Sequence, residues 1–249
     1  MTLTDALTLM FMKDLFSTPK GRVHFLTQVA DAENNDEGAI FEALKRRADD
    51  PQLQRLVQRH AADEERHARI LLERADAQGV PRPVIPENLK LLHRLDEALG
   101  GFFKKPLETN EDVMRMYLLL QVIEERAVTQ FAMFRDGLRE ADPKSADVFD
   151  VIEEDEERHL KYCHAIARKY APSEKVHDET LAHFREVEAK VFAQNSTRNL
   201  FHALKTGLLD VSAPKRAFWW SVGMLSRVLD PSKPTPFASV TLQPALEAA

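Results

Sequence analysis

The sequence predicts an all-α protein built around an antiparallel four-helix bundle, with one long crossover and extra helices at both ends of the chain. The composition favours helices, because 44% of the 249 residues are hydrophobic and only 8 are glycine. Apolar residues recur at intervals of three and four along several segments that end at Pro or Gly, which is the pattern of amphipathic helices. A five-residue motif also occurs twice, so the bundle is predicted to consist of two related halves.

The four bundle helices are predicted from this periodicity and from two Asp-Pro pairs. An Asp can cap the start of a helix and Pro suits its first turn, so Asp50-Pro51 and Asp142-Pro143 mark two helix starts. Residues 80–111, which are rich in proline at their start, are predicted to form the crossover. The bundle helices are expected at about 21–48, 51–77, 111–138 and 143–170.

Helices are also expected outside the bundle, at residues 3–16 and at about 174–193. The chain is therefore predicted to have three parts. These are an N-terminal amphipathic helix at 1–19, a four-helix bundle with the candidate site at 20–172, and a C-terminal helical extension at 173–249.

The bulk composition excludes several classes of protein. The net charge of -6 argues against a general nucleic-acid binder. Cys163 is the single cysteine, which excludes a disulfide framework and a cysteine-based metal knuckle. The start of the chain has no basic leader with a cleavage site, and no apolar run reaches the roughly 18 residues of a membrane span. The expected location is the cytoplasm.

The repeated motif is Asp-Glu-Glu-Arg-His, at residues 63–67 and again at 155–159, an offset of 92. The same offset carries Glu33 onto Glu125 and one Asp-Pro pair onto the other. Several features that coincide at a single offset indicate two structurally equivalent helix pairs.

The motif has the spacing of a metal-binding helix face. Glu64 and His67 are three residues apart, so they lie one turn from each other on a face that is otherwise apolar. An unpaired charge there would be costly, so each motif needs a partner, and helix lengths place Glu33 opposite Glu64. With the second half included, four Glu and two His face the interior, as in di-metal carboxylate proteins. The predicted ligands are Glu33, Glu64, His67, Glu125, Glu156 and His159.

Over about residues 20–170 these motifs resemble the ferritin-like di-iron carboxylate superfamily. Asp-Glu-x-Arg-His is similar to the motif of bacterial multicomponent monooxygenases, acyl carrier protein desaturases and the ribonucleotide reductase small subunit. The resemblance implies two iron ions, or iron with manganese, bound by the six predicted ligands. It also implies that Asp63 and Asp155 each orient the His of the opposite motif, braced by Arg66 and Arg158.

Three further residues are considered beside this set. Thr129, one turn after Glu125, matches a threonine that the monooxygenases place on the oxygen-binding side. His60 is either an extra ligand, as in some di-iron N-oxygenases, or a polar neighbour of the site. Glu37 is either a bridging or alternate ligand or a nearby carboxylate. The chain lacks the cysteine-rich tail and the third-helix Glu-x-x-Glu of rubrerythrins, with Val128 in place of the second Glu.

The C-terminal region differs in character from the bundle. Residues 198–230 combine a Trp pair with several Lys and Arg residues, a pattern typical of helices that lie on a membrane surface. Peripheral membrane contact through 198–230 is one interpretation. The other is a helix packed on the bundle or on a second subunit, so a homodimer stays open.

The leading functional prediction is a di-iron oxidoreductase that activates O₂ or peroxide and acts on a small organic substrate. An electron donor protein is expected as a partner, and nucleic acid is not. One alternative is a rubrerythrin-like peroxidase or a ferroxidase that handles iron and peroxide. The other is a non-catalytic helical interaction module.

Overall fold

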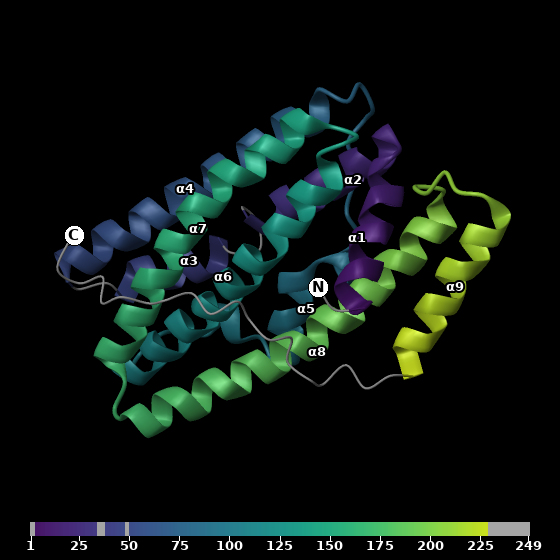
Figure 1. The fold of residues 1–249 in the computed structure, drawn as a ribbon. Coiled ribbons are helices and arrows are strands. Elements are labelled where there is room, and N and C mark those ends of the chain that lie inside the picture. The colour runs from purple at the N-terminus through teal and green to yellow at the C-terminus, as the bar shows by residue number, and fades with distance from the viewer. Residues whose placement is uncertain (1–2, 34–37, 48–49, 229–249) are drawn as a thin grey trace.

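The computed structural model describes residues 3–33, 38–47 and 50–228, and every regular element in that part of the chain is helical (Figure 1). The predicted all-α class is confirmed. Glu37 and residues 229–249, which include the end of the segment 198–230, lie outside the described residues.

The helices follow the predicted order. They are α1 (Leu3–Phe16), α2 (Pro19–Asp31), α3 (Gly38–Arg47), α4 (Pro51–Asp76), α5 (Leu91–Ala98), α6 (Asn110–Leu138), α7 (Pro143–Tyr170), α8 (Glu174–Thr206) and α9 (Ala213–Val228). Two short 3₁₀ helices, η2 (Glu87–Leu89) and η3 (Phe102–Lys104), lie with α5 in the segment predicted as the crossover.

Both predicted Asp-Pro starts are confirmed. Asp50 caps α4, and its carboxylate accepts a hydrogen bond from the backbone N–H of Gln52 at 2.8 Å. Asp142 caps α7 and accepts from the backbone N–H of Ser145 at 3.2 Å. In each case Pro occupies the first turn, where its missing N–H costs nothing.

The segment predicted as one helix from 21 to 48 contains α2, a π-helical turn at residues 32–33 and α3, and residues 34–37 between them lie outside the described residues. One predicted boundary differs from the structure. The helix predicted to end at 193 continues as α8 to Thr206. Its polar stretch is accommodated by hydrogen bonds, because Asn195 donates to the Leu89 carbonyl and Thr197 to the Ala193 carbonyl.

The helices pack in antiparallel neighbours that leave α9 at one edge of the molecule. α6 and α7 share an extensive interface, α2 packs on α4, and α4 contacts α7. α8 runs along α5 and α6, and α9 packs on α8 (Figure 1). Among the described residues, no helix combines the length and the apolar character that crossing a bilayer requires.

A band of buried polar side chains lies between two apolar cores. Along α4, Leu53 and Val57 belong to one core and Leu71 and Ala75 to the other, with buried polar residues between them. α7 shows the same order in reverse. The second core also includes residues of α1, α8 and α9, so the terminal helices pack on the same interior. The division into parts at 1–19, 20–172 and 173–249 stays a prediction.

Candidate metal centre

The buried polar band is supplied by four helical segments. On α4, His60, Glu64 and His67 are spaced by four and three residues, so they share one face, and all three are at most 3% exposed. α7 contributes Glu156 and His159, which are also buried.

The other two helical segments each add one glutamate. Glu33 lies in the π-helical turn after α2, and Glu124 lies on α6. Both side chains are buried. A π turn is rare and often found at functional sites, because it turns a side chain away from its regular helical direction.

These side chains form two groups, each with ligand atoms that all lie within 4.8 Å of one another. The first group is Glu33, Glu64, His67 and Glu156. The second group is His60, Glu64, Glu124 and His159. Two buried clusters of Glu and His that can hold metal ions are therefore present in the described part of the chain.

In the first group the carboxylates surround one ring nitrogen. Nδ1 of His67 is 3.3 Å from Glu33, 3.4 Å from Glu64 and 3.2 Å from Glu156. Ligands about 2.1 Å from a shared ion are roughly 3 to 4 Å from each other, so these separations fit one coordination shell.

The second group has two imidazoles. Nε2 of His60 is 3.0 Å from Oε1 of Glu64 and 3.0 Å from Oε1 of Glu124. Nδ1 of His159 is 3.2 Å from the same Oε1 of Glu64. The second group is therefore richer in nitrogen than the first.

Glu64 and Glu156 link the two groups. Glu64 directs Oε1 toward His60 and His159 and Oε2 toward His67. Glu156 directs Oε1 toward His67 and Oε2 toward His159. Glu64 belongs to both groups, and Glu156, a member of the first group, also contacts His159 of the second, so these two carboxylates would be the ones shared between two bound ions.

Several of these atoms are close without forming hydrogen bonds. Both ring nitrogens of His60, Oε1 of Glu64 and Oε1 of Glu156 are buried and make no hydrogen bond. Buried polar atoms are normally satisfied, so such a set needs an explanation. A metal ion held by these residues would satisfy such atoms, because all of the residues belong to groups whose ligand atoms lie within 4.8 Å of one another.

The charge of the centre also fits two cations. Its four carboxylates, from Glu33, Glu64, Glu124 and Glu156, carry four negative charges when ionised. Two divalent ions balance that charge with all imidazoles neutral. Without a balancing charge, so many buried carboxylates would be very costly.

The pKa values of the cluster show the same need for positive charge. Burial raises the pKa of Glu33 well above its ordinary value, and the Glu64 carboxylate adds to the shift. Burial opposes ionisation of Glu64, but its close contacts with His159 and the other two histidines hold its pKa well below the usual range. Burial likewise opposes protonation of His159, yet its contacts with Asp63 and two glutamates raise its pKa to about 11.

Each motif orients the histidine of the other. Nε2 of His67 lies 3.2 Å from Asp155, and Nε2 of His159 lies 3.3 Å from Asp63. A carboxylate partner holds the ring proton on Nε2, which leaves Nδ1 of each ring as the ligand atom.

Two arginines join these aspartates across the helix pair. Arg158 donates to Asp63 at 2.6 Å and contacts Asp155 at 2.6 Å, and Arg66 also contacts both aspartates. Burial opposes ionisation of both aspartates, but the hydrogen bond with a histidine, and after it the arginines, hold the pKa of Asp63 and of Asp155 below the ordinary value. Both aspartates therefore stay ionised and continue to orient the imidazole rings of His67 and His159.

Glu125, predicted as a ligand, is not in either group. Its carboxylate accepts two hydrogen bonds from Arg185 on α8, at 2.8 and 2.5 Å, and one from Gln121 at 2.9 Å. The preceding residue, Glu124, takes the inward position instead. One residue along a helix rotates the side chain by about 100°, so the two glutamates cannot both face the centre.

The two glutamates that complete the groups do not sit at equivalent positions of the repeat. Glu33 and Glu124 are 91 residues apart, whereas the two motifs are 92 residues apart. Glu33 lies in a π-helical turn, and Glu124 lies in the regular helix α6.

Thr129 does not direct its hydroxyl at either group. The hydroxyl donates to the backbone carbonyl of Glu125 at 2.8 Å, within the same helix. This bond is common for threonine in helices. The predicted role on the oxygen-binding side stays a prediction.

Glu124 and Arg185 are the site-related residues that the sequence did not single out. The Glu124-Glu125 pair marked the correct turn of α6 but not the correct residue. α6 is buried on most of its circumference, including residues 116–122 and 124–126, because it contacts α1, α7 and α8. The apolar periodicity therefore could not select one face.

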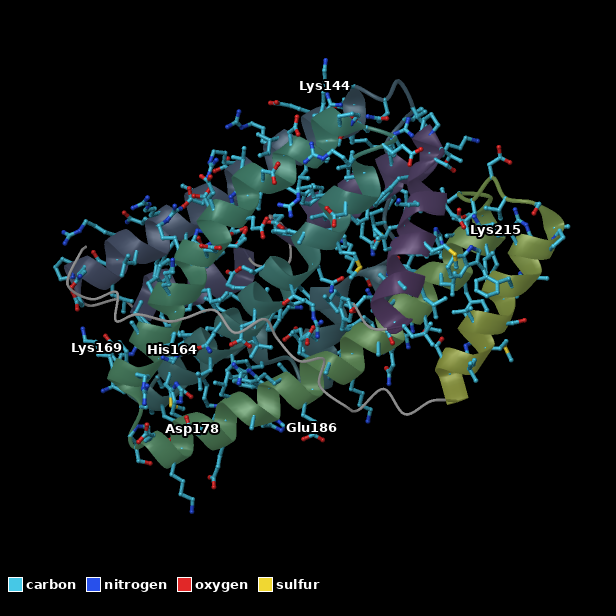
Figure 2. All side chains as sticks on the ribbon, in the orientation of Figure 1. Lys144, His164, Lys169, Asp178, Glu186 and Lys215 are labelled. Carbon is cyan, nitrogen blue, oxygen red and sulfur yellow. The ribbon has the colours of Figure 1, made fainter. Side chains whose placement is uncertain are left out.

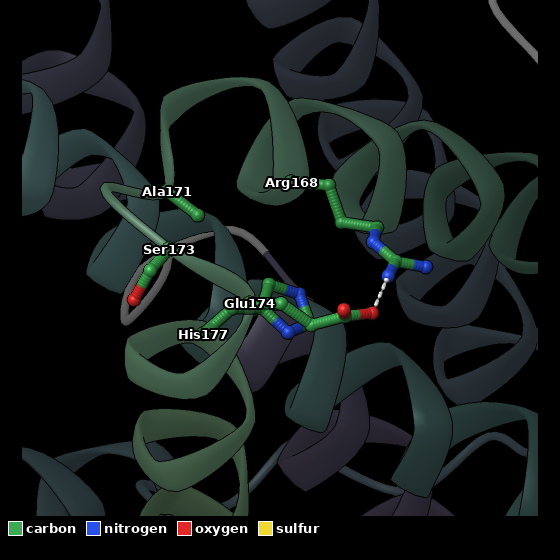
Figure 3. Close-up of a pocket in the computed structure, with 5 residues that line it drawn as sticks. All are labelled: Arg168, Ala171, Ser173, Glu174 and His177. Carbon is green, nitrogen blue, oxygen red and sulfur yellow. Dashed lines mark hydrogen bonds and ion pairs between the residues drawn. The ribbon is translucent and has the colours of Figure 1, made fainter.

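A surface cavity lies away from the centre. It has a volume of about 200 Å³ between the end of α7 and the start of α8 (Figure 3). It is lined by Arg168, Ala171, Ser173, Glu174 and His177, none of which belongs to the two groups. This cavity therefore carries no argument about a substrate for the centre.

Comparisons of the chain with models of known protein families, with curated proteins and with solved structures each found no match. Function is therefore inferred from the site itself.

Proposed function

We propose that this chain is a non-haem di-iron, or iron–manganese, oxidoreductase of the ferritin-like type that activates O₂ or peroxide and acts on a small organic substrate. The observation that carries the proposal is the pair of shared carboxylates. Glu64 and Glu156 each present one oxygen to each of two buried ligand groups. A structural site that binds a single ion does not need carboxylates that face two separate ligand groups.

The helix arrangement supports the ferritin-like type. Two helix pairs, α2 with α4 and α6 with α7, are joined by a long segment that contains α5. Each pair supplies one Glu from its first helical segment and a Glu-x-x-His from its second. This is the ligand pattern of di-metal carboxylate bundles.

The donor set supports iron or manganese. The first group has three carboxylates and one imidazole, the second has two of each, and no cysteine takes part in either. Hard oxygen ligands with imidazole suit iron and manganese better than copper or an iron–sulfur cluster. Bound iron supplies the electrons that reduce O₂ or peroxide.

The residues around the ions have separate tasks. Seven residues would hold the ions, and they are Glu33, His60, Glu64, His67, Glu124, Glu156 and His159. Asp63 and Asp155 keep the ring protons on Nε2, which fixes the orientation of both rings. The two apolar cores on either side keep bulk water from the centre. An electron donor protein would restore the reduced ions after each cycle.

The test compares two neighbouring variants, Glu124→Ala and Glu125→Ala. Crystals grown with iron would be examined by anomalous scattering, and solutions by metal analysis. We expect two ions per chain in the wild type and in Glu125→Ala, and loss of the ion in the second group in Glu124→Ala. Two ions in Glu124→Ala with loss in Glu125→Ala would restore the ligand set predicted from the sequence.

The same preparations separate the proposal from its alternatives. If the wild-type protein binds neither iron nor manganese, the non-catalytic interaction module is the interpretation that remains. Oxidation of far more than two iron ions per chain, without an organic substrate, would point to a ferroxidase. The proposal requires that the reduced protein turns over O₂ and keeps its two ions.

A further inference from the structure

Helix α9 has two apolar faces, and within the described part of the chain one is packed while the other is largely exposed, with only Trp220 also packing against Phe201. Trp219 is 1% exposed, donates its indole N–H to Asp14 at 2.8 Å and packs edge-on against Phe11 of α1. Gly223 lies against Phe201 of α8, so closely that an added Cβ would be 2.8 Å from the ring. Through this packed face α9 is held against α1 and α8.

The opposite face of α9 is apolar and exposed. Phe218 is 41% exposed, Trp220 38%, Met224 53% and Leu225 59%. At 3.6 residues per turn these four side chains, with Ala217 and the exposed Ser221, cover one continuous side of the helix. Isolated exposed apolar residues are ordinary, but a contiguous group on one helix marks an interaction surface.

The charged residues of α9 itself are all basic, and they are Lys215, Arg216 and Arg227. Lys215 pairs with Asp14 of α1 at 2.5 Å. Arg216 donates to backbone carbonyls, and the guanidinium of Arg227 lies over the Phe201 ring, so neither of these two charges is neutralised by those contacts. Residues 195–228 contain five Lys or Arg and one Asp, whereas the whole chain has 34 Lys and Arg against 40 Asp and Glu. The basic charge is therefore concentrated where the apolar face is exposed.

The basic residues flank the exposed face instead of interrupting it. By helical rotation Arg216 and Arg227 fall beside Trp220, and Lys215 falls on the far edge of the packed side. Figure 2 shows Lys215 at the start of α9. An apolar face edged by cations and aromatic rings is the arrangement of helices that lie in the headgroup region of a membrane.

We propose that the face of α9 formed by Phe218, Trp220, Met224 and Leu225 binds an anionic membrane surface. A second copy of the chain is a poorer occupant, because pairing two such helices brings like charges together. An anionic lipid layer offers both an apolar interior for the four side chains and negative charge for the flanking cations. α9 then lies parallel to the membrane while the packed face keeps its contacts with α1 and α8.

The test is flotation of the full-length protein with vesicles of phosphatidylcholine and phosphatidylglycerol at low salt. The variant Met224→Glu/Leu225→Glu places two charges in the exposed face. The matched control is Val84→Glu/Val151→Glu, because Val84 and Val151 are 93% and 48% exposed and lie outside α9. We expect the wild type and the control to float and the α9 variant to lose about ten-fold or more in binding.

A second variant keeps the apolar side chains in place. Ser221→Glu adds one charge to the middle of the same face, where residue 221 is exposed. We expect it also to weaken binding, with an unchanged unfolding temperature and metal content that show an intact fold. High salt, or vesicles of phosphatidylcholine alone, should reduce binding of the wild type.

Three results would overturn the proposal. The first is wild-type protein that stays at the bottom of the gradient at low salt. The second is vesicle binding that Met224→Glu/Leu225→Glu does not change. The third is a wild-type dimer that the same variant converts to a monomer, without any vesicle binding, which would make a second copy of the chain the occupant of this face.

Discussion

Asp155 illustrates how single residues outside the ligand set control the centre. It lies 3.2 Å from Nε2 of His67 and also contacts Arg66 and Arg158. Its carboxylate therefore orients the His67 ring, and the two arginines keep the carboxylate in place. Its counterpart Asp63 does the same for His159. Through this cross-connection each motif orients the histidine of the other.

We predict that Asp155→Asn keeps the fold but weakens metal binding by roughly ten-fold or more. The amide can still accept a hydrogen bond from His67, but the ring loses the negative charge that makes Nδ1 a strong donor. Competition with a chelator measures the affinity. Glu157→Gln is the matched control, because that neighbouring carboxylate is 51% exposed and faces away. Equal affinities in both variants and the wild type would contradict the proposed role.

At the scale of the helix, the two repeated Asp-Pro starts are not equivalent. Asp142 is buried, and besides its capping bond it accepts hydrogen bonds from Arg74 at 3.0 Å and Gln78 at 2.7 Å. It therefore joins the start of α7 to the end of α4. Asp50 makes its capping bond and one exposed contact with Lys169.

We predict that Asp142→Ala lowers the free energy of unfolding by about 2 kcal/mol, because it removes a helix cap and leaves the partly buried guanidinium of Arg74 without its carboxylate. Asp50→Ala should lower it by less, since water can replace the lost contacts. Denaturant unfolding of the metal-free proteins measures both. An equal loss for the two variants would show that the connection to α4 contributes nothing.

At the scale of the whole molecule, the centre joins four helical segments across the boundary between two apolar cores. Glu33, Glu64, Glu124 and Glu156 each come from a different segment. Metal ions held by all four would resist separation of the helix pairs. Binding to the folded state alone stabilises it, by about 3 kcal/mol when free metal exceeds the dissociation constant a hundred-fold.

We predict that removing the metal lowers the unfolding temperature, and by more at pH 8 than at pH 6. The pKa of His67 is raised, and that of His159 is raised to about 11, so both rings bind protons in the metal-free folded state. Metal must displace these protons, and its affinity therefore rises with pH. The stability that the protonated rings give the metal-free form is fully present below their ordinary pKa and is lost as the pH rises toward 11.

Thermal unfolding of loaded and metal-free protein over this pH range measures the effect. Asp142→Ala is the control, because it changes stability without touching the ligands and should show the same dependence on pH. A difference between loaded and metal-free protein that is the same at every pH would contradict the exchange of metal for protons.

Local sequence was sufficient for the class of fold and for most of the site. The spacing of Glu64 and His67 and its repetition at Glu156 and His159 are properties of one helix each, so the periodicity of the α-helix places them on one face without knowledge of the rest. The Asp-Pro starts are also local, because a cap and a first-turn proline act within a few residues.

Tertiary structure decided which residues complete the two groups. On α6, Glu124 faces the centre, whereas the neighbouring Glu125 accepts hydrogen bonds from Arg185 of α8. The place of His60 depends on two glutamates, Glu64 on its own helix and Glu124 on another. α6 is buried on nearly every side, so its apolar periodicity does not identify one inward face. The packing of the neighbouring helices therefore determines which carboxylate of α6 faces the centre.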